Sequence, residues 1–383
     1  MINIYMSVFY KHRGLIDSEI IWLAVIFAIT NVSSEILSSC SADTYGRKRI
    51  LVLGVLCYLG YWVVYLQADS FFLFCIGTLS YAASCALFSG TDQALLYDSI
   101  KEFYTKDQVE QKYKKYIGWF YAASRYSKIM SPILSVLLVK TAKESNFFYL
   151  FYIDIAASIF ALILVCRLVE AGRTANNKIS GTFRELVAGA VSVVTGDSGL
   201  KKIALEKSLL MSSSFAVLSY YTDFFHRDLG VDMFSFSILW SFHHGAVAWF
   251  SIYVSPKIRQ RVRWVNRVYL KILLLLIGFI ALWFMRVEGD VVFAYVLYVV
   301  FVTIFILKGF LLPLYSAMVQ EKAASHNRAT VISVTDMLKG VTDVLVIGTS
   351  ALLVEFGKIY PYFVFMFCML VIVLFLARGQ WSD

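Results

Sequence analysis

The stretch SCSADTYGRKR, residues 39–49, decides how the rest of the chain is interpreted. It separates two apolar runs, residues 20–39 and 50–66, and each run approaches the roughly 20 residues that cross a bilayer as a helix. Gly46 permits a tight turn between antiparallel helices, because glycine adopts left-handed backbone conformations without steric cost. The basic residues after it are typical of a cytoplasmic loop. The stretch therefore predicts a short basic turn between two membrane-spanning helices.

The composition extends this interpretation to the whole chain. Of the 383 residues, 59% are hydrophobic and 16% are charged, against roughly 25% charged in a soluble domain. Uninterrupted apolar runs such as residues 272–284 (ILLLLIGFIALWF) lack the alternation of a transmembrane β-strand. An all-α integral membrane protein is predicted, and the composition argues against a soluble enzyme. The eleven predicted spans are residues 20–39, 50–66, 70–89, 116–139, 146–168, 203–221, 234–254, 268–285, 291–312, 329–353 and 360–376.

The first ten residues (MINIYMSVFY) are apolar but reach only about 15 Å as a helix, half of a roughly 30 Å hydrocarbon core. We interpret them as a first helix truncated at its N-terminus, which brings the count to twelve. The longest polar gap, residues 169–202, is the predicted cytoplasmic linker and contains an amphipathic helix. It separates an N-terminal bundle of six helices, residues 1–168, from a C-terminal bundle of six, residues 203–383.

The loops between successive spans lie alternately on the two sides of the membrane, and they differ in their content of lysine and arginine. If the loop at Gly46 is cytoplasmic, the cytoplasmic segments hold about three times as many Lys and Arg residues as the opposite side. The sequence therefore predicts a multi-pass protein of the cell's inner, cytoplasmic membrane with both termini in the cytoplasm. The net charge of +9 serves topology, and no nucleic acid partner is expected.

The basic stretch resembles the loop between helices two and three of the major facilitator superfamily, G-x-x-x-D-x-x-G-R-K/R-x. Ser39 replaces the leading glycine, and the matching residues, which the resemblance makes a gating motif, are Asp43, Gly46, Arg47, Lys48 and Arg49. Residues 35–39 (EILSS), 90–99 (GTDQALLYDS) and 328–333 (RATVIS) resemble further strings of bacterial members, the second at the end of helix four. At helix five only Pro132 of the glycine-rich antiporter motif is present, so antiport is not implied. The family's fold is two six-helix bundles related by a pseudo-two-fold axis.

Charged residues inside predicted spans are candidate substrate or proton-pathway residues, because each is costly in lipid unless it has a partner or a wet cavity. In the family, most of the helices that carry them face the central cavity. The candidates are Glu35, Arg125, Lys128, His243, Lys308, Asp336, Lys339 and Asp343.

Each candidate also has a structural interpretation. Asp336, Lys339 and Asp343 share one helix face and can form an ion-pair ladder that only neutralises the helix. Glu35 fits gating or packing better than proton carriage, and His243 fits hydrogen-bonded packing better. Lys207 is explained by snorkelling towards the cytoplasmic end of its helix. The many aromatic residues are expected mainly to face lipid and the membrane interface.

These observations predict a secondary transporter that moves a small solute by alternating access, with proton-coupled efflux as one form. The cavity charges lean towards an anionic or zwitterionic solute. A non-transporting, sensor-like member of the family stays open as an alternative, and a membrane-embedded enzyme is a weaker one. We expect no catalytic residues, metal or cofactor, and we expect a monomer whose partners are the solute, protons and the lipid bilayer.

Overall fold

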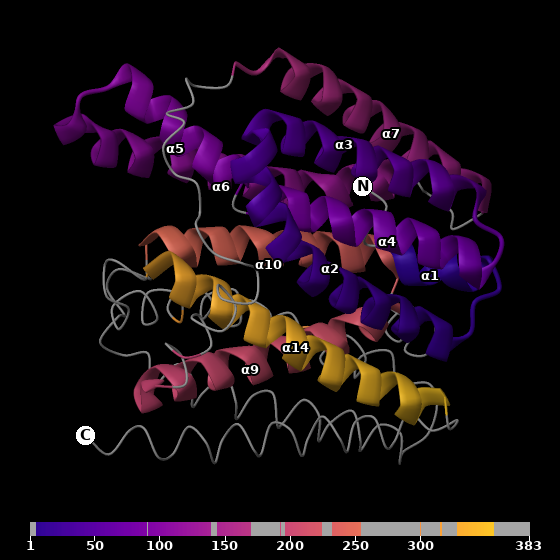
Figure 1. The fold of residues 1–383 in the computed structure, drawn as a ribbon. Coiled ribbons are helices and arrows are strands. Elements are labelled where there is room, and N and C mark those ends of the chain that lie inside the picture. The colour runs from indigo at the N-terminus through magenta and orange to yellow at the C-terminus, as the bar shows by residue number, and fades with distance from the viewer. Residues whose placement is uncertain are drawn as a thin grey trace. The chain divides into compact units, whose positions relative to one another are not determined.

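The computed structural model describes residues 5–89, 91–138, 144–169, 192, 196–223, 232–253, 299, 315 and 328–355. These residues form helices and no strand, so the all-α prediction is confirmed for them (Figure 1). Contacts divide the chain into two compact units. Unit 1 contains Met1–Ile16 and Ile26–Ser180, and unit 2 contains Asp17–Val25 and Gly181–Asp383. The predicted bundle limits stay a prediction.

Unit 1 contains a series of helices joined by short turns. They are α1 (Met6–His12), the larger part of α2 (Asp17–Tyr45), α3 (Arg47–Gln67), α4 (Phe71–Phe88), α5 (Thr91–Phe103), α6 (Lys106–Leu138) and α7 (Glu144–Arg167). Helix α3 packs against α4 and α7, and α5 packs against α6 and α3. Among the described residues, four helices are long and apolar enough to span a bilayer, with windows at Asp17–Ser34, Arg47–Gln67, Phe71–Phe88 and Phe147–Arg167.

The region around residue 90 differs from the prediction. The sequence predicts one helix through residue 89 with GTDQALLYDS at its end, but α4 ends at Phe88 and a separate helix, α5, begins at Thr91. Helix α6 begins at Lys106, ten residues before the predicted span. Hydropathy does not detect this first part of α6, because many of its residues are charged. Lysine, glutamine and glutamate nevertheless form helices readily.

An aromatic core joins α1, α3, α4 and α7. The ring centroid of Phe9 on α1 lies 6.1 Å from that of Phe74 on α4 and 4.9 Å from that of Phe151 on α7. Trp62 on α3 lies 5.9 Å from Phe151, and all four side chains are fully buried. The expectation that aromatic residues mainly face lipid is wrong for this set, because edge-to-face ring contacts between helices bury large areas that composition cannot assign to a face.

Gly77 on α4 lets Tyr65 on α3 approach the α4 backbone. The Tyr65 hydroxyl shares hydrogen bonds with Thr78 Oγ1 at 2.7 Å and with the Tyr10 hydroxyl at 3.1 Å. A Cβ atom built on Gly77 would stand 2.4 Å from two atoms of the Tyr65 ring. No Cβ fits there while the ring keeps its place.

We therefore expect Gly77→Ala to destabilise the protein by about 1–3 kcal/mol, the usual cost of overpacking a core. The measurement is the thermal unfolding midpoint of the purified protein in detergent. Gly60→Ala is the matched control, because a Cβ at Gly60 meets only Ser80 Oγ at 3.4 Å. The control should be neutral or stabilising, and an equal loss in both variants would contradict the role of Gly77.

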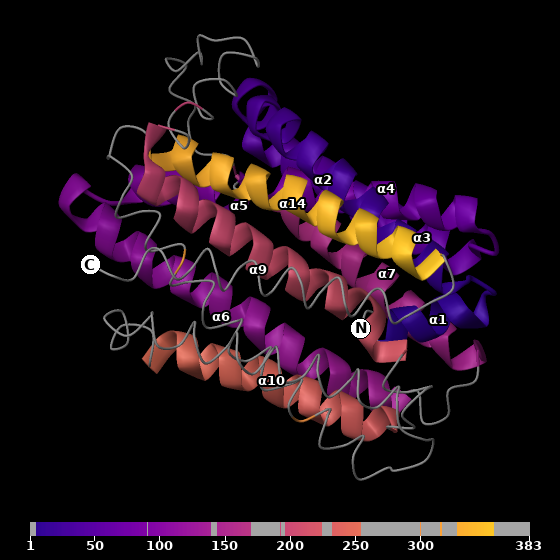
Figure 2. The ribbon, with the colours of Figure 1, turned by 90° about the horizontal axis from the view of Figure 1, so that it is seen from below.

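Unit 2 contains the start of α2 together with α9 (Ser198–Asp223), α10 (Met233–Tyr253) and α14 (Arg328–Glu355). Helices α9 and α14 pack side by side along their length (Figure 2). Asp197 Oδ1 accepts the backbone N–H groups of Gly199 and Leu200 at 2.8 and 3.0 Å, and Asp232 caps α10 in the same way. The predicted spans 268–285 and 360–376 lie outside the described residues, as do the predicted span 291–312 except Val299 and the predicted linker helix except Ser192.

Candidate functional site

The turn of the basic stretch consists of Gly46 alone. Helix α2 ends at Tyr45 and α3 begins at Arg47. Gly46 has φ +99° and ψ 140°, a conformation that a residue with a Cβ rarely adopts. The chain therefore makes the tight turn that the sequence predicts, and it places Arg47 in the first turn of α3.

Arg47 connects α3 to α5. Its Nη1 atom donates to the carbonyl oxygen of Ala94 at 2.6 Å and forms an ion pair with the Asp98 carboxylate. A cation at the start of a helix is unfavourable, because the free backbone N–H groups there carry partial positive charge. The negative charge of the Asp98 carboxylate offsets the charge of Arg47 beside the partly positive start of α3. Asp98 is not among the predicted site residues, although it lies in the GTDQALLYDS string.

The other members of the motif have no described partner. Lys48 is half-buried and Arg49 is exposed. Neither makes an ion pair within the part of the chain that the structure describes. The side chains of Asp43 and Glu35 lie outside the described residues, and so does Lys308.

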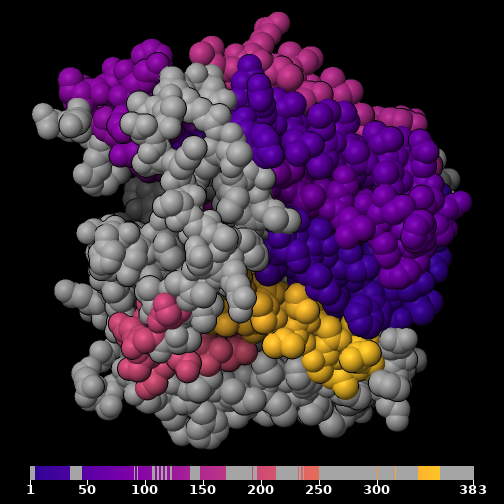
Figure 3. Space-filling view, viewed as in Figure 1, coloured from indigo at the N-terminus to yellow at the C-terminus, as the bar shows by residue number. Residues whose placement is uncertain are grey.

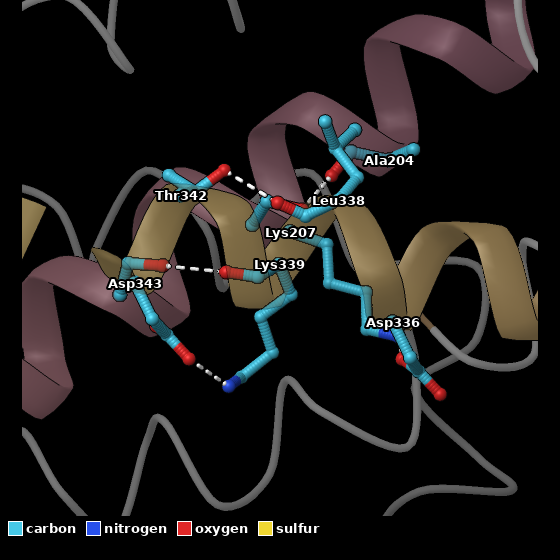
Figure 4. A network of polar contacts seen from close by, with 9 residues as sticks. Ala204, Lys207, Asp336, Leu338, Lys339, Thr342 and Asp343 are labelled. Carbon is cyan, nitrogen blue, oxygen red and sulfur yellow. Dashed lines mark hydrogen bonds and ion pairs between the residues drawn. The ribbon is translucent and has the colours of Figure 1, made fainter. Parts of the chain in front are cut away.

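A second set of polar residues, which we call the charge cluster, lies along α9 and α14 in unit 2 (Figure 4). It consists of Glu206 and of four residues that Figure 4 labels: Lys207, Asp336, Lys339 and Asp343. Lys207 Nζ donates to Asp336 Oδ1 at 2.8 Å. The Lys207 side chain is 5% exposed and that of Asp336 is 41% exposed. Snorkelling therefore does not explain Lys207, because its ammonium ends on a carboxylate of the neighbouring helix.

The predicted ladder on α14 is present only in part. Lys339 Nζ lies 2.5 Å from Asp343 Oδ2, one turn further along the same helix. The third predicted member, Asp336, bonds to α9 instead. Asp343 is buried, and its Oδ1 atom has no hydrogen-bond partner among the described residues. This oxygen can accept a hydrogen bond or a proton.

Glu206 is a functional candidate that the sequence does not single out. It precedes Lys207 on α9, and its Oε1 atom accepts a hydrogen bond from the Tyr315 hydroxyl at 2.6 Å. Both side chains are buried, at 2% and 1% exposure. The available signal is the one that marked the other candidates, an acid inside a predicted span. The charge cluster thus places three carboxyl groups and two ammonium groups on two adjacent helices.

His243 and its neighbour His244 lie on α10 against one tryptophan. The Trp240 ring centroid is 5.1 Å from that of His243 and 5.2 Å from that of His244. His243 is 6% exposed. This environment is one of ring packing, and the hydrogen bond that the packing interpretation of His243 includes stays a prediction.

Arg125 and Lys128 lie three residues apart on α6, hence on one face of the helix. Arg125 is half-buried and Lys128 is exposed. Neither makes an ion pair or a side-chain hydrogen bond within the described segments. Their predicted contact with solute stays a prediction.

Comparison with solved structures supports the fold. A mutant of the nucleoside transporter NupG superposes with a TM-score of 0.76 and 14% identity, covering 97% of this chain and 93% of that one. A D-xylose-proton symporter gives 0.71 at 13% identity, covering 100% and 92%. A bacterial homolog of the human lysosomal transporter Spinster gives 0.69 at 14% identity, covering 98% and 91%. At such identities the likeness shows the fold alone.

The sequence itself carries the family assignment. A search of curated proteins finds no match. The family model of the Major Facilitator Superfamily matches residues 1–346, which is most of the chain. Membership of this family points to a multi-pass membrane transporter rather than an enzyme. The turn at Gly46, the all-helical architecture and this match agree, and the chain belongs to the major facilitator superfamily.

Proposed function

We propose that this protein is a proton-coupled secondary transporter of a small anionic or zwitterionic solute. It works as a monomer in the inner membrane, with both termini in the cytoplasm, and exposes its binding site alternately to the two sides. Family membership and the bias of basic residues support this proposal. The buried carboxyl groups of the charge cluster are groups of the kind that bind protons inside membranes.

The two cations on α6 carry the proposal about the solute. A guanidinium keeps its charge at any physiological pH, so a half-buried Arg125 needs an acceptor in every state of the transport cycle. Lys128 on the same face adds a charge of the same sign. In the described residues no carboxylate neutralises either cation, while Asp336 and Asp343 are bonded to lysines. A negatively charged group of the solute would supply the acceptor.

A ligand-induced thermal shift screen across organic acids, amino acids, nucleosides and cationic compounds tests this proposal. We expect acids or zwitterions to raise the unfolding temperature of the wild type. Arg125→Gln should abolish the shift while the unfolding temperature without ligand stays close to that of the wild type. The matched control is Lys115→Gln, which removes an exposed cation from the same helix and should keep the shift.

Two results would contradict the proposal. Stabilisation by cationic compounds alone would contradict the assigned solute class. Binding of an acid without uptake into proteoliposomes, with or without a proton gradient, would favour the sensor-like alternative. If Arg125→Gln instead changes the pH dependence of uptake and retains binding, the acceptor of Arg125 is a carboxylate of the protein.

A further inference from the structure

The hairpin formed by α5 and the start of α6, residues 91–119, has a surface that the proposed transport cycle does not use. Tyr104 and Thr105 connect the two helices, and the backbone N–H of Val109 donates to the Thr105 carbonyl at 3.1 Å. The rings of Tyr97 and Tyr113 meet edge to face at 5.3 Å across the hairpin. The backbone hydrogen bond closes the first turn of α6, and the ring contact holds α5 and α6 to each other.

The hairpin has buried aliphatic residues and exposed aromatic ones. Leu95, Ile100 and Val109 are at most 7% exposed, whereas Phe103 is 80% and Trp119 is 68% exposed. Phe103 precedes the predicted span by more than ten residues, so lipid chains around a membrane helix do not account for it. Figure 3 shows the hairpin's violet side chains at the surface, at the upper left. An exposed phenylalanine costs roughly 1.5–3 kcal/mol in water relative to burial.

Two lysines lie over aromatic rings of the hairpin. Lys112 Nζ lies 4.9 Å from the centroid of the Tyr104 ring, and Lys115 Nζ lies 5.8 Å from that of Trp119. Lys101 is also exposed and lies two residues before Phe103 in α5. Residues 101–115 contain more lysines than acids, the lysines being Lys101, Lys106, Lys112, Lys114 and Lys115 and the acids Glu102, Asp107 and Glu110. Aromatic rings among lysines match a membrane interface with apolar chains below and phosphates above.

We propose that the hairpin docks on anionic lipid headgroups of the cytoplasmic leaflet and that this docking regulates transport. Phe103 enters the boundary between headgroups and acyl chains, and the lysines bind the phosphates. Helix α5 also carries Asp98, the acceptor of Arg47 in the basic stretch. Headgroup binding therefore fixes the helix that holds Arg47, and turnover depends on anionic lipid. The regulatory part rests on the proposed transport function and the proposed topology.

The test of docking does not depend on transport. The six native cysteines are replaced by serine, and Thr105→Cys, at an exposed turn position, carries an environment-sensitive fluorophore. The full chain is placed in nanodiscs of phosphatidylcholine with increasing amounts of phosphatidylglycerol. We expect emission to shift to the blue as phosphatidylglycerol increases, because the probe enters a less polar layer.

Matched variants assign the shift to the hairpin. Each lysine near an anionic surface contributes about fivefold in affinity, so Lys101→Gln/Lys115→Gln should weaken the phosphatidylglycerol dependence by roughly 30-fold. Lys201→Gln/Lys202→Gln removes the same charge from two exposed positions on α9 and should leave it unchanged. Phe103→Ser should decrease the blue shift of the emission and should leave the thermal unfolding midpoint unchanged.

Each alternative outcome overturns a defined part of the proposal. An emission unchanged in every lipid overturns docking on a membrane, and a shift equal in phosphatidylcholine alone overturns the anionic headgroup as its partner. Docking with equal turnover in both lipids overturns regulation. If the hairpin docks but the protein takes up no solute in any lipid, the proposed docking stands and the proposed transport function is refuted.

Discussion

Asp336→Asn should destabilise the protein by about 3 kcal/mol, the largest stability effect that we expect of a single substitution here. The change leaves the Lys207 ammonium, which is 5% exposed, without its counter-ion at 2.8 Å. Removing one partner of a buried ion pair costs about 3–5 kcal/mol, and the lower limit applies because Asp336 is partly exposed. Chemical unfolding of the purified protein in mixed micelles measures the loss.

The pair also predicts an asymmetry and a rescue. Lys207→Met should cost less than Asp336→Asn, because the remaining carboxylate is 41% exposed and can stay hydrated. The double variant Lys207→Met/Asp336→Leu should recover most of the stability, since apolar side chains replace the pair without an unpaired charge. Lys202→Met, at an exposed position of the same helix, is the control. A double variant as unstable as Asp336→Asn would show that the pair does not act as a unit.

The rescued variant separates the two interpretations of this charge. If the Lys207–Asp336 pair only neutralises the helices, the stable double variant transports at the wild-type rate. If the pair exchanges partners or protons during the cycle, stability returns without uptake. Uptake into proteoliposomes at several pH values distinguishes the two.

The largest kinetic effect is expected at Arg47. Arg47→Gln breaks the ion pair with Asp98 and the bond to the Ala94 carbonyl, both of which connect α3 to α5. A loss of about 1.4 kcal/mol in one state of the cycle changes the ratio of states about tenfold. We expect turnover to fall roughly tenfold while solute affinity is retained, because the basic loop is predicted to lie half a bilayer from the cavity centre.

Lys48→Gln is the matched control for this prediction. It removes the next basic residue of the same turn, which has no ion-pair partner among the described residues, and should leave turnover unchanged. Asp98→Asn should slow turnover less than Arg47→Gln, because the bond to Ala94 remains. If Arg47→Gln and Lys48→Gln behave alike, the motif is a topology anchor and has no gating role.

Local features of the fold were predictable because local chemistry decides them. The predicted spans 50–66 and 234–254 agree within a few residues with α3 and α10. The bounds of an apolar run can be read from consecutive residues without knowledge of the tertiary structure. The turn at Gly46 follows from a backbone conformation that glycine adopts without strain. The sequence does not predict that α4 ends at Phe88 and that α5 begins at Thr91, because both segments are helical and hydropathy does not mark the boundary between them.

The candidate site was predictable in its residue types but not in its pairings. Asp336, Lys339 and Asp343 are recognisable as costly charges inside a predicted span. Nothing along the sequence indicates that Asp336 bonds to Lys207, 129 residues away, while Lys339 bonds within its own helix. The same holds for Arg47 with Asp98, and for Glu206 with Tyr315.

The amino-acid sequence by itself determined that the described part of this chain is helical and that the chain belongs to the major facilitator superfamily. The tertiary structure alone decided which helix faces meet. That choice buries Phe9 and Trp62 in a common core, places the Tyr65 ring over Gly77 and directs Lys207 to Asp336. The physical reason is range: helix formation depends on residues within a few positions, whereas the partner of a buried charge or ring depends on segments brought together only by packing.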